Sequence, residues 1–220
     1  MCPFRLTRVL LSALILSALS LSASASTPSL SSLPFFTRPP PYSFSTLSAS
    51  DNPYLSQLSN ASYDHQTLDH FGWSVSTVRW SQHYLYSTQH WLPPSDPNGP
   101  GPIFLYAGNE GPIETFAGNS GWMFELAESF NAMLVFVEHR FYGRSMPWGD
   151  GNATMSYANV STLSLLTSEQ AIADYVQFVE WMRAGGHESE IGPFSQCRGN
   201  CSSIPVIVFG GSYGGMLAAW

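Results

Sequence analysis

The stretch PVIVFGGSYGGMLAAW, residues 205–220, decides the fold class of this chain. Its apolar run 206–209 leads directly into Gly-Gly-Ser-Tyr-Gly, and a segment compatible with a helix follows. This is a G-x-S-x-G motif in the context that the motif requires, between a buried strand and a helix. Ser212 is therefore predicted to be a nucleophile, held in a strained turn that projects its hydroxyl from the sheet. The alternative is an ordinary glycine-rich turn. The glycines that leave room for the turn are Gly210, Gly211 and Gly214.

Backbone N–H groups near this serine are candidates for stabilising a negatively charged intermediate. The N–H of Tyr213 lies at a helix N-terminus, where negative charge is favoured. A second tight turn, 108–111, follows the apolar run 103–107, and in hydrolases with this motif the loop after the third strand supplies another donor. Asn109 and Glu110 are the candidates there, with a purely structural turn as the alternative. A phosphate-binding loop is disfavoured, because neither G-x-G-x-x-G nor the lysine-containing P-loop pattern is matched.

The general base that a serine nucleophile needs is missing from the expected place. The order in this fold is Ser, then Asp or Glu, then His, yet neither an acid nor a histidine follows Ser212. A Ser–Lys pair is excluded, because all 8 basic residues are arginines. The upstream histidines are interpreted as surface or strand-edge residues: His65, His70, His83, His90, His139 and His187. We therefore expect an N-terminal portion of a longer hydrolase, inactive and poorly soluble by itself.

Alternating strands and helices indicate the fold class. The apolar runs 103–107, 132–137 and 206–209 are predicted to be buried strands, and helices are predicted at 123–130 and 168–183. Continuous apolar strands separated by helices are typical of a parallel sheet covered on both faces. The sequence therefore predicts an α/β fold.

Two further segments carry local signals. Thr167 and Gln170 form a T-x-x-Q capping box before helix 168–183, and the glycines of 184–186 are expected to end that helix. Its predicted core-facing stripe comprises Ala171, Tyr175, Phe178 and Met182. Alternation over 75–91 predicts a pair of strands.

The N-terminal region is predicted to lie outside the folded domain. Residues 1–25 combine arginines, an apolar stretch and an A-x-A-like site, which is the pattern of a signal peptide. The apolar stretch is shorter than the roughly 20 residues of a membrane span, so no stable membrane anchor is expected. Residues 26–62 are rich in serine and proline and are interpreted as a leader or propeptide, with the domain at 63–220.

Composition and modification motifs agree with the secretory pathway. The net charge of −7 disfavours a nucleic-acid partner. N-x-[ST] motifs predict a glycoprotein, against the alternative of chance, at Asn60, Asn152, Asn159 and Asn200. In an oxidising compartment, Cys197 and Cys201 are expected to form a small disulfide. A zinc half-site is the rival, but no further ligands stand at suitable spacing, so neither metal nor cofactor is expected.

Long blocks of the chain resemble a known family in the same order. The blocks are QTLDHFGW (66–73), PIFLYAGNEGPIETF (102–116), SGWMFELAESFNAMLVFVEHRFYGRSMPWG (120–149), LLTSEQAIADYVQFVEWMR (165–183) and the stretch 205–220. They are similar to the lysosomal Pro-X carboxypeptidase and dipeptidyl peptidase II family of serine peptidases. The resemblance implies an α/β-hydrolase domain with a helical insertion, Ser212 as the acylated nucleophile, and peptide substrates cut beside proline.

Several alternatives stay open. An esterase or lipase of the same fold would share the G-x-S-x-G motif, and a catalytically inactive glycoprotein would explain the missing base. The signal peptide predicts the secretory pathway, and by itself it does not distinguish a lysosome, a vacuole and the extracellular space as the destination. The sequence does not separate carboxypeptidase from dipeptidyl peptidase, and it makes no prediction of oligomeric state.

Overall fold

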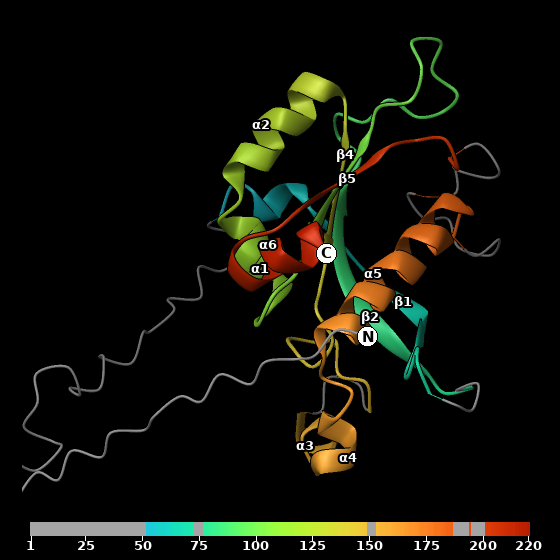
Figure 1. The fold of residues 1–220 in the computed structure, drawn as a ribbon. Coiled ribbons are helices and arrows are strands. Elements are labelled where there is room, and N and C mark those ends of the chain that lie inside the picture. Colours follow the sequence, from blue (N-terminus) through green and yellow to red (C-terminus); the bar gives the residue numbers. More distant parts are fainter. Residues whose placement is uncertain (1–51, 73–76, 149–152, 187–193, 195–200) are drawn as a thin grey trace, which may run out of the picture. The chain divides into compact units, whose positions relative to one another are not determined.

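The computed structural model in Figure 1 describes most of the chain from residue 52 onward. The described residues are 52–72, 77–148, 153–186, 194 and 201–220. They belong to one compact unit, Thr46–Trp220. The predicted signal peptide and most of the predicted leader lie outside them. Among the described residues, no helix is both long and apolar enough to cross a bilayer.

The described strands form one sheet in the order β1-β2-β4-β3-β5. The strands are β1 Ser59–Thr67, β2 Arg79–Ser87, β3 Ile103–Ala107, β4 Met133–Val137 and β5 Val206–Phe209. β3 pairs in parallel with both β4 and β5, whereas β2 is antiparallel to β1 and β4. The parallel part matches the predicted runs, and an antiparallel pair extends it on one side.

Helices cover both faces of this sheet. The helices are α1 Ile113–Gly118, α2 Gly121–Phe130, α3 Ala153–Ser156, α4 Val160–Leu163, α5 Ser168–Arg183 and α6 Ser212–Ala219, with a 3-10 turn η2 at Leu55–Gln57. α1 and α2 lie on one side of the sheet and α5 on the other (Figure 1). Accordingly there are two apolar cores, one between the sheet and α1–α2 and one between the sheet, α5 and α6. The result is a three-layer α/β fold, as predicted.

The predicted pair of strands at 75–91 is wrong. The described part of that segment holds one strand, β2, and its partner is β1, which starts at Ser59, before the expected domain boundary at residue 63. β1 carries mostly polar side chains and is largely exposed, because it is the outermost strand of the sheet. Its sequence therefore lacks the apolar alternation by which half-buried strands are recognised.

Helix α5 has the predicted limits but only half of the predicted capping box. The Thr167 hydroxyl accepts the backbone N–H of Gln170 at 3.3 Å. The Gln170 side chain does not return to Thr167; instead it donates to Asp69 Oδ1 at 2.6 Å and accepts the backbone N–H of His70 at 3.0 Å. The helix then ends at two glycines with φ values of 95° and 67°, Gly185 and Gly186. The predicted apolar stripe of α5 is buried.

Candidate active site

Ser212 lies in the turn between β5 and α6 that the motif predicts. Its φ is 53°, in the left-handed region that non-glycine residues rarely occupy. The residue is exposed, and it is the first residue of α6. A side chain held in a sparsely populated backbone conformation, at the carboxyl end of a parallel strand, is a common feature of catalytic sites.

Close backbone contacts explain the glycines around Ser212. A Cβ on Gly210 would lie 2.1 Å from the carbonyl oxygen of Gly214, and one on Gly214 would lie 2.4 Å from the carbonyl oxygen of Ala107. Real Cβ atoms do not approach so closely, so both positions require glycine for their contacts. The second contact presses the start of α6 against the end of β3. This packing fixes Ser212 relative to the loop that follows β3.

The loop 108–111 is the second predicted donor segment, and it lies beside the serine turn. A Cβ on Gly214 would come within 3.3 Å of Asn109 Oδ1. The loop is anchored at Gly108, whose N–H donates to Val137 at 2.9 Å and whose carbonyl accepts the Tyr175 hydroxyl at 2.7 Å. Within the described residues, no backbone carbonyl accepts the N–H of Asn109 or Glu110. Both N–H groups therefore stay candidates for an oxyanion hole, together with that of Tyr213.

The side chain of Tyr213 is held by a neutral histidine. His139 is buried, and its Nδ1 contacts the carbonyl oxygen of Arg140 at 2.6 Å, so Nδ1 carries the proton. Its Nε2 then accepts from the Tyr213 hydroxyl, at a long 3.4 Å. Burial lowers the pKa of His139 below its ordinary value, which keeps the ring uncharged. Burial, and then the nearby Glu110 carboxylate, raise the pKa of Tyr213.

A base for Ser212 is not among the described residues. None of their hydrogen bonds involves the Ser212 hydroxyl, and His139 contacts Tyr213 rather than Ser212. Of the other histidines, His70 pairs with Asp174 and His83 lies in a separate cluster. His187 lies outside the described residues.

A buried ion pair supports the site from the α5 side. Arg140 directly follows His139 and is fully buried. Its guanidinium makes two contacts of 2.6 Å with the Asp174 carboxylate, from Nε and Nη2. It also donates to three backbone carbonyls, those of Thr67, Leu68 and Leu165. Because every charged atom has partners, this pair ties β4, α5 and the end of β1 together.

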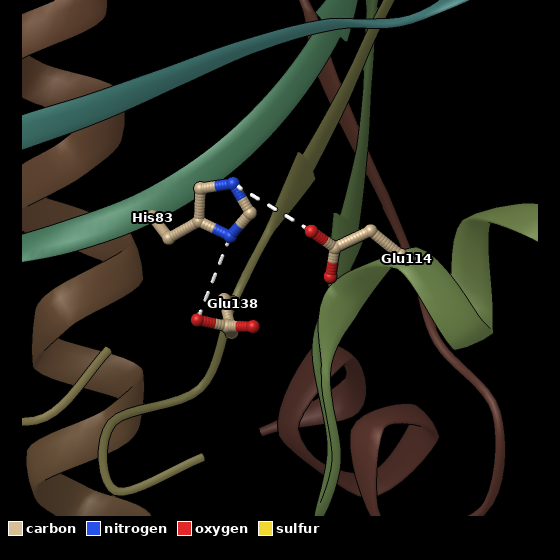
Figure 2. A group of neighbouring side chains, drawn as sticks. All are labelled: His83, Glu114 and Glu138. Atoms are coloured by element: carbon tan, nitrogen blue, oxygen red, sulfur yellow. Dashed lines mark ion pairs between the residues drawn. The ribbon is translucent and has the colours of Figure 1, made fainter. Parts of the chain in front are cut away.

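A second buried carboxylate, Glu138, belongs to the only described group with the composition of a metal site. In this group, His83, Glu114 and Glu138 place ligand atoms within 4.8 Å of one another. Figure 2 shows His83 between the two carboxylates, with Nδ1 3.6 Å from Glu138 and Nε2 4.0 Å from Glu114. The Glu138 carboxylate already accepts from the backbone N–H groups of Ile113, Arg144 and Ser145 and from the Ser145 hydroxyl. These four hydrogen bonds, three of them to Oε2, hold the carboxylate in place, and the group is better explained as a structural cluster.

The remaining predicted residues are only partly visible. Asn60 lies on β1 and Asn159 caps α4, whereas Asn152 and Asn200 lie outside the described residues. Cys201 is buried and forms a disulfide. Its predicted partner Cys197 lies outside the described residues.

Sequence reasoning did not predict which buried polar residues anchor the segments after β3 and β4. These residues are Glu138, Arg140, Asp174 and Tyr175. The available signal was the run Glu-His-Arg directly after an apolar strand, because charged residues at that place lie at the carboxyl edge of a sheet. Asp174 and Tyr175 gave no such signal, since an acid and a tyrosine on an amphipathic helix are ordinary.

Comparisons with known proteins find similar sequences over most of this chain. The family model described as "Serine carboxypeptidase S28" matches residues 66–220. The Lysosomal Pro-X carboxypeptidase of Mus musculus is 38% identical over 173 residues, which cover 79% of this chain and 31% of the relative. That of Homo sapiens is 38% identical over 170 residues, covering 76% and 29%. The human Thymus-specific serine protease is 34% identical over 175 residues, covering 79% and 29%. The chain thus spans less than a third of the length of these relatives.

Proposed function

The chain belongs to the serine carboxypeptidase S28 family, and on that premise we propose that it contributes the nucleophile, Ser212, to the hydrolysis of peptides. Its sheet and covering helices have the α/β-hydrolase architecture. The observation that carries the proposal is the exposed Ser212 with a φ of 53°, in a glycine-flanked turn between β5 and α6.

The proposed chemistry is acyl transfer to the serine. A base removes the proton of the Ser212 hydroxyl as its oxygen attacks the peptide carbonyl. The negatively charged oxygen that forms is stabilised by the N–H of Tyr213 and by a donor from the Asn109–Glu110 turn. The C–N bond then breaks, the amine leaves with a proton, and water hydrolyses the acyl-enzyme.

We propose that the base and its carboxylate partner come from sequence outside this chain. The support is the length of the relatives, and the lack of a base at Ser212 among the described residues. The substrate is proposed to be a peptide with proline near the scissile bond, because two of the relatives are named for Pro-X cleavage. Their lysosomal names and the predicted signal peptide support a lysosomal, vacuolar or extracellular destination.

The test joins this chain to the portion of the mouse relative that follows its matched segment. We expect the secreted fusion to cleave a peptide with proline before the scissile bond, and Ser212→Ala to abolish turnover. The matched control is Ser203→Ala, an exposed serine in the turn before β5, which should leave turnover unchanged. Full turnover by Ser212→Ala would refute the assignment, and hydrolysis of acyl esters alone would favour the esterase alternative.

The chain by itself provides the complementary test. Without a base at Ser212, the 220-residue protein should neither cleave the peptide nor react with a fluorophosphonate. This outcome would support the alternative that the chain, when it stands alone, is a catalytically inactive glycoprotein. Labelling of Ser212 in the separate chain would show that a described or undescribed residue of this chain already acts as the base.

A further inference from the structure

A polar cavity of about 630 Å³ lies beside the antiparallel pair β1–β2, and the proposed activity does not use it. Its walls come from both strands and from the segment after β4, and its chemically distinctive side chains are Asp64, Arg79, Ser81, His83, Arg144 and Trp148. Its volume falls in the range of roughly 300–1,000 Å³ that is common for small-ligand sites. None of its lining residues belongs to the serine turn or to the loop 108–111.

The charges around the cavity are balanced. Two arginines and one acid, Asp64, line the cavity, and a second acid, Glu114, lies 3.5 Å from Arg144, so the formal charges cancel. Ser81 donates its hydroxyl to Asp64 at 2.6 Å, so acid and hydroxyl form a small polar wall. The half-buried Trp148 adds an apolar ring. Hydrogen-bonding groups of both kinds with an aromatic face and little net charge suit a neutral, hydroxyl-rich ligand that has apolar surfaces of its own, which is the chemistry of a sugar.

Asn60 stands at the rim of this cavity. Its Oδ1 accepts from Nε2 of His83 and, at 3.2 Å, from Nη1 of Arg144, and both partners line the cavity. Ser62, the serine of the Asn60-Ala61-Ser62 motif, lines the cavity too and faces His83 across the strand pair. Among the described residues, the Asn60 amide nitrogen has no hydrogen-bond partner. The carbonyl oxygen is thus fixed, and the nitrogen to which a sugar attaches is left available.

We propose that Asn60 carries an N-linked glycan whose first sugar residues occupy this cavity. The transfer forms a bond between Asn60 Nδ2 and C1 of the first sugar. It breaks the bond between C1 and the pyrophosphate of a lipid-linked oligosaccharide donor, and Nδ2 loses one proton. Since the Oδ1 atom is unchanged by this reaction, its contacts with His83 and Arg144 persist and aim the sugar along the cavity wall.

Asn159 provides a matched site that does not line this cavity. The Asn159 Oδ1 accepts hydrogen bonds from the N–H of Thr162 at 3.1 Å and from the Ser161 hydroxyl at 2.5 Å. In both asparagines the carbonyl oxygen is therefore engaged and the amide nitrogen Nδ2 is left for the sugar. Asn159 is exposed, and its neighbour Val160 is 83% exposed. A glycan there would extend into solvent.

The experiment compares the two sites in the full chain secreted from a eukaryotic host. Glycopeptide mapping should find sugar on Asn60, and Ser62→Ala should remove it without altering the asparagine, as Ser161→Ala should for Asn159. Peptide N-glycosidase treatment of the native protein should then release the Asn60 glycan about tenfold more slowly than the Asn159 glycan, because seated sugars must first leave the cavity. After denaturation, both rates should be equal.

Variants of the cavity wall test whether contacts between the glycan and the cavity cause the slow release by the glycosidase. Trp148→Ala should bring the native rate at Asn60 close to that at Asn159, and Asp64→Ala tests the opposite wall if the first variant is not secreted. Unmodified Asn60, equal native rates at the two sites, or protection that persists in the wall variants would each overturn the proposal. The test does not depend on Ser212, so its result is independent of the proposed activity.

Discussion

At the scale of single residues, the motif predicted a strained turn at Ser212, and the positive φ of Ser212 agrees with that prediction. A φ of 53° costs free energy for any residue with a Cβ, on the order of 1–3 kcal/mol. The glycines at 210 and 214 were predictable too, as residues that leave room for the turn, but the atoms that they contact were not. A Cβ at these positions would lie 2.1 Å and 2.4 Å from a carbonyl oxygen, and in the second case that oxygen belongs to Ala107 on another strand. A contact between remote segments leaves no trace in the local sequence.

The strain at Ser212 predicts an inverted ranking of two substitutions. The free energy of unfolding of Ser212→Gly should be about 1 kcal/mol higher than that of Ser212→Ala, because glycine adopts positive φ without a steric penalty. Urea denaturation of the full chain, followed by circular dichroism, measures the difference. At Ser129, an exposed position in α2, the order should reverse, since alanine is favoured in helices by about 1 kcal/mol over glycine. Equal stabilities of the two variants at 212 would show that the turn is unstrained.

His139 predicts a pH dependence of stability. Burial lowers the pKa of His139 in the folded protein, whereas in the unfolded chain the ring has the ordinary histidine pKa of about 6.5. As the pH falls below that value, the unfolded state binds the proton first, so the free energy of unfolding decreases by at most about 1.4 kcal/mol per pH unit. His139→Gln should lose this contribution and show a shallower fall between pH 7 and pH 5. Parallel curves for the two proteins would contradict the assignment of a neutral buried ring.

At the scale of elements, the sequence predicted those segments whose signals are local. β3, β5 and α5 have the predicted limits, because continuous apolar runs, a threonine cap and terminal glycines mark them directly. The first residues of β1, 59–62, were assigned to a leader, because an outer strand with a mostly solvated surface needs little apolar sequence. α1 is too short for a helical period to be recognised. The support beneath the site was not predictable, since a buried Arg140 looks like a surface residue until its partners are known.

The docking of α5 depends on the Arg140–Asp174 pair. Asp174→Asn should lower the free energy of unfolding by about 3–5 kcal/mol, because it leaves a fully buried guanidinium without its counter-charge. Glu180→Gln, on the same helix but exposed, should change it by no more than about 0.5 kcal/mol. Chemical denaturation of the two variants makes the comparison. Similar small effects would mean that the ion pair contributes no more than a surface contact.

At the scale of the whole molecule, the described sheet has unequal edges. β1 presents polar side chains to solvent, whereas β5 at the opposite edge is apolar and partly exposed. Ile207 and Val208 are 43% and 41% exposed. An apolar strand with unpaired backbone groups invites pairing with another chain.

This edge predicts that the separate chain self-associates. Ile207→Lys should reduce association markedly, because a charge on an edge strand opposes strand pairing. Val160→Lys, at an exposed apolar position on α4, should have no effect. Sedimentation velocity over a range of concentrations distinguishes the two variants. A monomer that stays monomeric at high concentration without the substitution would exclude this use of the β5 edge.

The reach of α5 across the sheet has a practical consequence for engineering. The Tyr175 hydroxyl donates to the carbonyl of Gly108, and the Asp174 carboxylate pairs with Arg140. One helix therefore anchors both the loop after β3 and the loop after β4. Grafting either loop from a homologue without its matching helix would detach it from its anchor. Loops and helix should therefore be exchanged together, as one unit.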